Sequence, residues 1–233
     1  MSNQPQFGLA PIERETVQER VYATLRDKLM RGGFAPGQKL KIADLAGALG
    51  TSAMPVRDAL NRLTAERAVE SLPNRGVRVA HLSKESLQDL RETRFAVEGL
   101  AVERAAEHMD HETLADLRRL IEAQTDTDDQ HVSESSAEQN REFHFTIYRR
   151  SKSAVLLPII ESLWLQCGPY LRIASELFDG RHGRGIDFHV EMVAALARGD
   201  GKAARLALQS DIGRSFELIL NDHNVWHRRG GPV

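Results

Sequence analysis

Two short helical patterns separated by a tight turn lie between residues 41 and 63. The first has four apolar residues at the spacing of one helix face: Ile42, Leu45, Ala46 and Leu49. Gly50 follows, and glycine tolerates the left-handed backbone that ends such a helix. The second pattern begins at Ser52, whose hydroxyl is expected to cap the new helix. Its inward residues are Val56, Ala59, Leu60 and Leu63. Together the patterns predict a helix-turn-helix.

One more helix and two extended runs surround this pair. The upstream helix is predicted from apolar residues four apart: Val17, Val21, Leu25 and Leu29. Gly32 and Gly33 are expected to stop it. Downstream, residues 69–72 and 77–80 are short extended runs, and the turn between them carries Arg75 near its tip. The region therefore predicts a winged helix-turn-helix in which the hairpin is the wing.

The rest of the chain has helical spacing almost throughout, without an internal repeat. Ser83 and Asp110 are expected to cap its first two helices. The first helix has an inward stripe made of Leu87, Leu90, Arg94, Val97, Ala101 and Ala105. Residues 125–136 are polar and acidic, which predicts a loop or a frayed helix end. Further helices are expected at 138–150, 155–177 with a kink at Pro158 or Pro169, 186–198 and 202–220. The predicted fold is mainly α, with an all-α antiparallel helical bundle after the winged helix-turn-helix.

Composition narrows the class of protein. At 233 residues the chain is long enough for two cores. No apolar run approaches the ~18 residues of a membrane span, and residues 1–6 lack a signal pattern, so we expect a soluble, cytoplasmic protein. Cys167 is the single cysteine and cannot form an intrachain disulfide. The net charge is −2, but residues 12–80 hold 12 Lys and Arg against 8 Asp and Glu. A basic excess on a small domain favours contact with the phosphates of a nucleic acid.

The N-terminal motifs resemble the GntR family of bacterial transcription regulators over about residues 15–80. They are Arg31-Gly32-Gly33 with Pro36-Gly37-Gln38-Lys39-Leu40, Asp44-Leu45-Ala46 with Leu49-Gly50, Pro55-Val56-Arg57-Asp58-Ala59-Leu60 with Leu63, and Pro73-Asn74-Arg75-Gly76-Val77 with Val79. Two positions depart from the family's pattern. The family often has Arg where Ala53 stands and Gly where Arg67 stands.

This resemblance implies that the helix beginning at Ser52 enters the major groove of DNA. The candidate DNA-contacting residues are Lys41, Thr51, Ser52, Ala53, Met54, Arg57, Asn61, Arg75 and Gly76. Arg57 is expected on a guanine edge or a phosphate, and a surface ion pair with Asp58 or Glu66 is the alternative. Lys41, Thr51 and Arg75 are expected to contact phosphates or the minor groove. Such contacts position the protein along the DNA without reading base sequence in the major groove.

The helical region resembles the FCD ligand-binding domain over about residues 88–220. The matching residues are Arg94 with Glu98, Asn140-Arg141-Glu142-Phe143-His144, Leu163-Trp164, His189, Ala195-Leu196-Ala197-Arg198-Gly199-Asp200 and Ala203-Ala204. Many FCD domains hold a divalent metal with one Asp or Asn and three His. Carried over residue by residue, the metal ligands here are Asn140, His144, His189 and Asp211, the last standing where His is usual. The resemblance thus implies Zn²⁺ or another first-row ion.

Two charged residues lie on apolar faces and need partners. An unpaired Asp211 carboxylate would be costly to bury, so either a metal or a hydrogen-bonded pair with His144 or His189 is expected. The FCD resemblance implies a small organic acid as effector, and Arg94, with Arg172, is the candidate site for its carboxylate. A salt bridge from Arg94 to an acid of the bundle, such as Glu98, is the alternative.

The leading hypothesis is a transcription regulator, a repressor, that binds a palindromic double-stranded DNA operator as a homodimer and responds to a small organic acid. A metal-dependent enzyme acting on a small carboxylate is a second class, but no hydrolase or phosphate-loop motif supports it. An oligomeric helical protein that binds another protein is a third. We expect a disordered tail at 1–11, the DNA-binding domain at 12–80, a linker at 81–87, an effector-binding and dimerisation domain at 88–222 and a tail at 223–233 that is either disordered or packed on the bundle.

Overall fold

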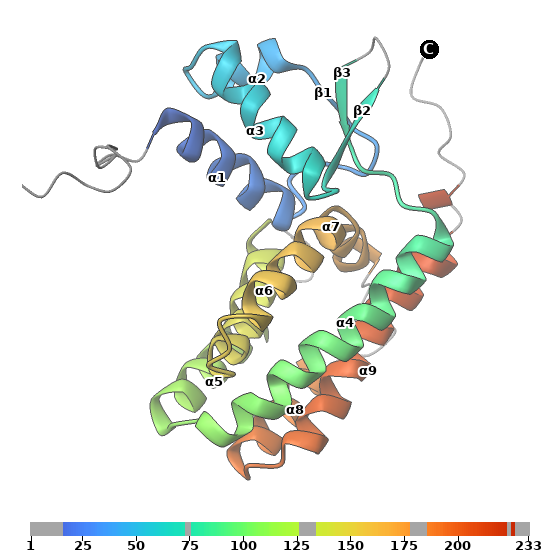
Figure 1. Cartoon of the computed structure of the whole chain (residues 1–233). Helices are drawn as coiled ribbons and strands as arrows, with labels where there is room; N and C mark the ends of the chain where they lie inside the picture. Colours follow the sequence, from blue (N-terminus) through green and yellow to red (C-terminus); the bar gives the residue numbers. More distant parts are fainter. Residues whose placement is uncertain (1–15, 73–75, 126–133, 178–185, 223–224, 227–233) are drawn as a thin grey trace, which may run out of the picture.

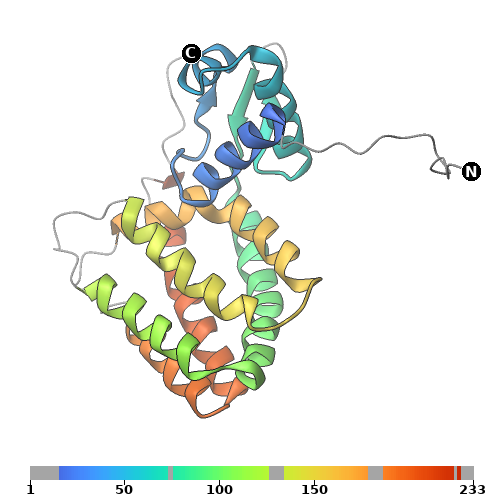
Figure 2. The same ribbon diagram turned by 90° about the vertical axis from the view of Figure 1, so that its left-hand side faces the viewer.

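The structure is a computed structural model that describes residues 16–72, 76–125, 134–177, 186–222 and 225–226. Figures 1 and 2 show a small N-terminal unit stacked on one end of a larger helical bundle. The N-terminal unit consists of α1 Val17–Met30, β1 Lys39–Leu40, α2 Ile42–Ala48, α3 Ala53–Ala65, β2 Val69–Leu72 and β3 Gly76–Val79. The bundle consists of α4 Lys84–Ala105, the 3-10 turn η1 Ala106–His108, α5 His111–Thr125, α6 Glu134–Arg149, α7 Leu156–Leu177, α8 Ile186–Ala197 and α9 Gly201–Asn221.

The predicted helix-turn-helix and its wing are confirmed. The inward residues of α3 that the spacing identified are all buried. β2 pairs with β3 in an antiparallel hairpin in which Val69 lies opposite Val79. The structure adds a strand, β1, that the pattern did not predict because it is only two residues long. β1 pairs with β3, and Leu40 lies opposite Val77. The sheet order is therefore β1-β3-β2.

Local signals placed most helix ends correctly. Gly32 and Gly50 have φ of 68° and 61°, as expected where a helix ends in the left-handed region. Ser83 accepts a hydrogen bond from the Ser86 amide, and Asp110 accepts one from the Thr113 amide. The cap expected from Ser52 is wrong in one respect. Ser52 is the N-cap residue of α3, but its hydroxyl makes no capping hydrogen bond.

Arg67 occupies the position where the resemblance pointed to glycine. Its φ is 60°, in the left-handed region, at the turn that joins α3 to β2. A side chain with a Cβ is strained there, at a typical cost of ~1–2 kcal/mol. The family's preference for glycine at this position therefore has a backbone cause.

The antiparallel bundle is also confirmed, with helices close to the expected bounds. Because the Gly201 Cα lies close to the Glu103 backbone and Gly99 lies against Arg205, α4 and α9 run antiparallel. They lie side by side in Figure 1. One expected bound is wrong, because α6 begins four residues before the expected residue 138. α4 begins at residue 84, as the Ser83 cap predicted, so residues 80–83 join β3 to α4.

The N-terminal unit contacts the bundle through α1 and α7, which lie next to each other in Figure 2. A Cβ added at Gly168 would come within 2.3 Å of the Leu29 carbonyl oxygen and 2.9 Å of the Met30 Cα. The backbones of the two helices are therefore in direct contact. The Tyr170 hydroxyl accepts a hydrogen bond of 2.7 Å from the Leu82 amide, which ties α7 to the segment joining the two units.

The C-terminal segment packs on the bundle where it is described. The Trp226 indole N–H donates to the Ile219 carbonyl at 3.0 Å, and the Lys84 ammonium lies 5.4 Å from the centre of the Trp226 ring. The expected tail at 1–11, the position of Arg75, the rest of the 223–233 segment and most of the predicted loop at 125–136 lie outside the described residues. No helix among those described is both long and apolar enough to cross a membrane.

Replacing Arg67 by glycine should stabilise the protein. Glycine adopts the observed φ without strain, but it also gives the unfolded chain more conformational freedom. After this loss is subtracted, we expect Arg67→Gly to raise the free energy of unfolding by about 1 kcal/mol. Urea denaturation followed by circular dichroism measures this. Arg118→Gly, at an exposed position inside α5, is the control and should lower stability by about 1 kcal/mol. A less stable Arg67→Gly protein would contradict the strain argument.

Candidate functional site

The outer face of α3 is the candidate DNA interface. Met54, Arg57 and Asn61 are exposed on successive turns, whereas Val56 and Leu60 on the opposite face are buried in the core. Met54 is 62 % exposed, which is unusual for so large an apolar side chain. Ser52 and Ala53 at the start of the helix are exposed as well. The helix therefore presents its first two turns to the outside.

Arg57 is not held by the protein. Neither Asp58 nor Glu66, the alternatives from the sequence, pairs with it, and no other residue in the described ranges does so. Glu66 instead contacts Arg26 at 3.6 Å and accepts a short hydrogen bond from the Tyr22 hydroxyl. The Arg57 guanidinium is thus available for a DNA base or phosphate.

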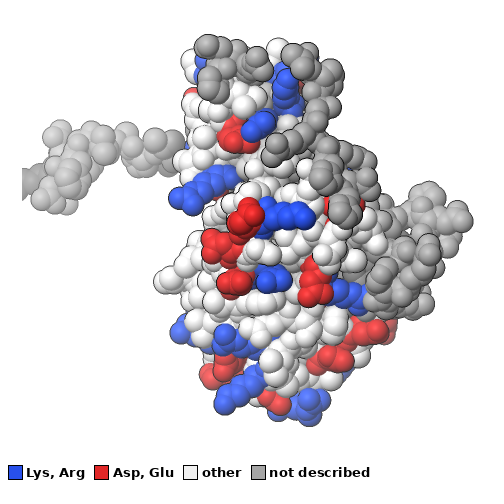
Figure 3. All heavy atoms as spheres, turned by 90° about the vertical axis from the view of Figure 1, so that its right-hand side faces the viewer, with Lys and Arg blue, Asp and Glu red and all other residues white. Residues whose placement is uncertain are grey.

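The remaining candidate DNA contacts lie around α3. Lys41 is exposed at the N-cap of α2, and Thr51 is half-buried in the turn before α3. Gly76 is exposed at the start of β3, with a φ of 88°. In the view of Figure 3, acidic and basic side chains alternate over the described surface of the bundle.

A second candidate site is buried in the bundle, where α6, α8 and α9 bring together His144, His189 and Asp211. One ligand atom from each lies within 4.8 Å of the others. His144 Nε2 is 3.2 Å from Asp211 Oδ2, and His189 Nε2 is 3.7 Å from Asp211 Oδ1. Asn140 is half-buried one turn before His144, on the same face of α6. Three of the four predicted metal ligands therefore form a cluster, which we call the His-His-Asp triad.

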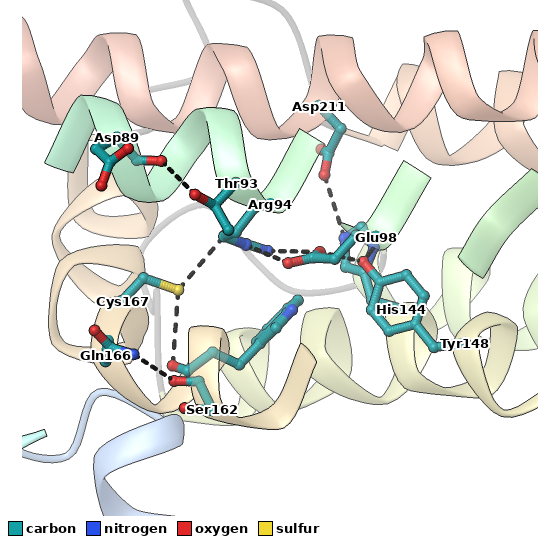
Figure 4. Close-up of polar contacts among 11 residues, drawn as sticks. Asp89, Thr93, Arg94, Glu98, His144, Tyr148, Ser162, Gln166, Cys167 and Asp211 are labelled. Atoms are coloured by element: carbon teal, nitrogen blue, oxygen red, sulfur yellow. Dashed lines mark hydrogen bonds and ion pairs between the residues drawn. The ribbon is translucent and has the colours of Figure 1, made fainter. Parts of the chain in front are cut away.

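Hydrogen-bond partners outside the triad orient both imidazoles. The His189 Nδ1 faces the Gln124 amide oxygen at 3.1 Å, and an oxygen there requires Nδ1 to carry the proton. The Tyr148 hydroxyl donates to Glu98 at 2.5 Å and lies 3.3 Å from His144 Nδ1. The hydroxyl proton goes to the carboxylate, so the Tyr148 oxygen is the atom that faces His144 Nδ1. His144 Nε2 lies 3.2 Å from Asp211 Oδ2 and donates a hydrogen bond to this carboxylate (Figure 4). With its proton on Nδ1, His189 has its Nε2 lone pair free, 3.7 Å from Asp211 Oδ1.

Burial sets the protonation of the triad. It lowers the pKa of His189 to about 4, although the neighbouring Asp211 carboxylate opposes this, so His189 is neutral at pH 7. Burial also works against the Asp211 carboxylate, but His189 and His144 outweigh it and the pKa of Asp211 is lowered. His189 Nε2 is buried and has no hydrogen-bond partner within the described residues. A neutral imidazole with a free lone pair beside a carboxylate is an arrangement that suits a bound cation.

Arg94 and Arg172 are not brought together. Arg94 is buried on α4 and binds both oxygens of Glu98, at 2.5 and 3.0 Å, while a third contact of 3.5 Å reaches the Cys167 sulfur (Figure 4). The alternative of a salt bridge to Glu98 is therefore what the structure contains. Arg172 lies at the contact with the N-terminal unit, where it donates to the Gly32 carbonyl at 3.4 Å.

Three residues around the triad were not predicted as part of a site. Tyr148 follows His144 by four residues, so helix spacing alone could have placed it on the same face. Glu98 had been considered only as a partner of Arg94. Gln124 lies on α5, and no local pattern relates it to His189, 65 residues away.

Comparison with known families agrees with this division of the chain. Residues 17–79 match the family described as bacterial regulatory proteins, gntR family, and residues 89–214 match the FCD domain. The chain is 28 % identical to the HTH-type transcriptional regulator McbR of Escherichia coli, over 93 % of this chain and 99 % of McbR. It is also 28 % identical to the E. coli HTH-type transcriptional repressor GlaR, over 81 % of this chain and 89 % of GlaR.

Solved structures share the whole arrangement. E. coli McbR/YncC superimposes with a TM-score of 0.81 and 29 % identity, covering 88 % of this chain and 98 % of that one. A GntR-type regulator from Rhodococcus sp. RHA1 has a TM-score of 0.73 and 25 % identity, with the same two coverages. These are transcriptional regulators and not enzymes. The chain belongs to the GntR family of bacterial transcriptional regulators, with an FCD domain after its DNA-binding domain.

Proposed function

We propose that this regulator is a repressor that binds a palindromic operator as a homodimer and is controlled by a small organic acid bound in its FCD domain. The observation that carries the DNA-binding part is the unpaired Arg57 on the exposed face of α3, beside Ser52 and Met54. A dimer with two-fold symmetry would place two such helices in successive major grooves, about 34–36 Å apart. Arg57 would read base edges, while Lys41 and Thr51 would hold phosphates.

We further propose that the His-His-Asp triad, with Asn140, holds Zn²⁺ or another first-row divalent ion. The donor set is chemically suitable, because two imidazoles, a carboxylate and an amide oxygen are ligands that such ions accept. The unpartnered Nε2 of the neutral His189 supports this more than the alternative of a metal-free polar core. Gln124 and Tyr148 would serve as outer hydrogen-bond partners that fix the ring orientations.

The proposed acid would bind beside the triad, where a bound metal would supply a positive charge for its carboxylate. The Trp164 indole N–H is buried without a partner among the described residues, and its ring lies 5.5 Å from the His144 ring. This N–H is a suitable donor for an acid oxygen. Arg94 could contribute by exchanging Glu98 for the ligand, because each of its three side-chain nitrogens already has a partner. Arg172 would act at the contact between the two units.

Arg57 should determine operator specificity. Arg57→Ala is expected to weaken binding to DNA selected by the wild-type protein from a random pool by about 1–3 kcal/mol, the worth of a bidentate base contact. The selected DNA should contain an inverted repeat. Fluorescence anisotropy measures both variants, and Arg118→Ala, which removes an exposed charge from α5, is the control. Equal affinity of the Arg57→Ala and wild-type proteins would contradict this role.

The same anisotropy assay tests control by a small organic acid. If the affinity for the operator stays unchanged across a panel of such acids, control by the acids of that panel is excluded.

The triad should retain one metal ion per chain. We expect elemental analysis and native mass spectrometry of untagged protein to show an ion that is lost in His189→Ala and in Asp211→Ala, since each removes a donor. His111→Ala, at an exposed position that starts α5, should keep the ion. An absence of metal, or metal that both triad variants retain, would make the cluster a polar core.

The metal-free protein should lose stability in acid through His189. In the unfolded chain this histidine takes up a proton near its usual pKa of 6.5, but in the folded chain it does so only near 4. The free energy of unfolding should therefore fall as the pH drops from about 6.5 to about 4. His189→Gln should flatten this dependence, whereas His111→Gln should not. Urea denaturation after chelation, at half-unit pH steps, measures it, and parallel curves for wild type and His189→Gln would contradict the assignment.

A further inference from the structure

A cleft of about 450 Å³ lies where α1 of the DNA-binding domain meets α6 and α7 of the bundle. Three arginines line it, Arg26 from α1 and Arg141 and Arg149 from α6, together with the carboxylates Asp27 and Glu161. None of the triad residues belongs to its lining. The cleft is therefore distinct from the buried His-His-Asp triad.

Two of the three arginines are fully occupied by neighbouring acids. Arg26 contacts Glu161 at 3.1 Å and Glu66 at 3.6 Å, so its charge is balanced across the domain contact. Arg149 is half-exposed and donates to Glu142 at 2.8 Å. These pairs account for Arg26 and Arg149 without any ligand.

Arg141 has no such balance. Its side chain is only 18 % exposed, and the nearest carboxylate, Asp27, is 3.6 Å away and already held by Arg31 at 2.9 Å. Within the described part of the chain Arg141 makes no hydrogen bond, and its Nε is buried without a partner. The Phe145 ring lies against it, 6.0 Å from its centre to the guanidinium carbon. An arginine Nε that is withdrawn from water without an acceptor is costly, so a ligand that supplies an acceptor is favoured here.

We propose that the cleft binds a small oxyanion, a carboxylate or phosphate compound, through the guanidinium of Arg141. Two oxygens on one carbon or phosphorus match the planar fork of arginine, and they would take the donors that Asp27 leaves unused. Arg149, two turns further along α6, lines the same cleft, but its pair with Glu142 already balances its charge. The volume lies within the range of small-molecule sites.

An anion in this cleft touches both domains at once. One wall is α1, which packs on the recognition helix α3, and the other is α6, which carries His144. Anion binding therefore favours some arrangements of the two domains over others, which changes the affinity for operator DNA. By thermodynamic reciprocity, operator DNA changes the affinity for the anion by the same factor.

Isothermal titration calorimetry of the full-length, metal-free protein tests the proposal. Citrate and inorganic phosphate are titrated separately at constant ionic strength, so that the two arms distinguish a carboxylate ligand from a phosphate ligand. We expect one saturable site per chain for at least one of them, with an affinity that falls tenfold or more in Arg141→Gln. Arg118→Gln removes an equal charge from an exposed position outside the cleft and should bind as the wild type does.

His189→Ala separates this site from the buried one. It should bind the anion unchanged, because the triad does not line the cleft, whereas loss of binding in this variant would place the anion at the triad and overturn the proposal. Absence of saturable binding of either anion, or equal binding by Arg141→Gln and wild type, would overturn it as well. If Arg141→Gln does not fold, Arg141→Lys keeps the charge without the planar fork and should weaken binding in the same direction.

Discussion

The ion pair between Arg94 and Glu98 is the constraint on which the bundle depends. Both side chains are at most 2 % exposed, and leaving one without the other in an apolar interior costs ~3–5 kcal/mol. One helix cannot satisfy all of their donors and acceptors. The Tyr148 hydroxyl from α6 completes Glu98, and the Trp164 and Phe216 rings from α7 and α9 lie 4.7 and 5.7 Å from the Arg94 guanidinium. A single polar pair on α4 thereby specifies which three helices surround it.

The same pair extends to the triad by a sequence of directed hydrogen bonds. Glu98 can only accept, so the Tyr148 proton points toward it and the phenolic oxygen faces His144. The orientation of His144 is in this way linked to a charge on another helix. Burial raises the pKa of Tyr148, which keeps its hydroxyl protonated and preserves the direction of the bonds. The residues that support the bundle therefore also orient His144.

Features with a local cause were predictable from the sequence, and those with a distant cause were not. Helix spacing and breakers such as Gly50 located the helix-turn-helix, because one turn of helix is determined by neighbouring residues. The resemblance to the FCD domain pointed to His144, His189 and Asp211, which the fold brings together. The pairing of Gln124 with His189 depends on how α5 packs on α8, and no periodicity encodes it. Arg94 was correctly placed on an inward face, but only the three-dimensional contacts show Glu98 already bound to it.

The backbone contact at Gly168 has a consequence for how such regulators diversify. α1 meets α7 through the carbonyl of Leu29 and the Cα of Met30, atoms that every amino acid possesses. The side chains of α3 that face outward take no part in this contact. Substitutions on the outer face of α3 can therefore accumulate while the junction between the DNA-binding domain and the FCD domain stays intact. Modular evolution of this kind needs a joint built from main chain, and a glycine supplies it.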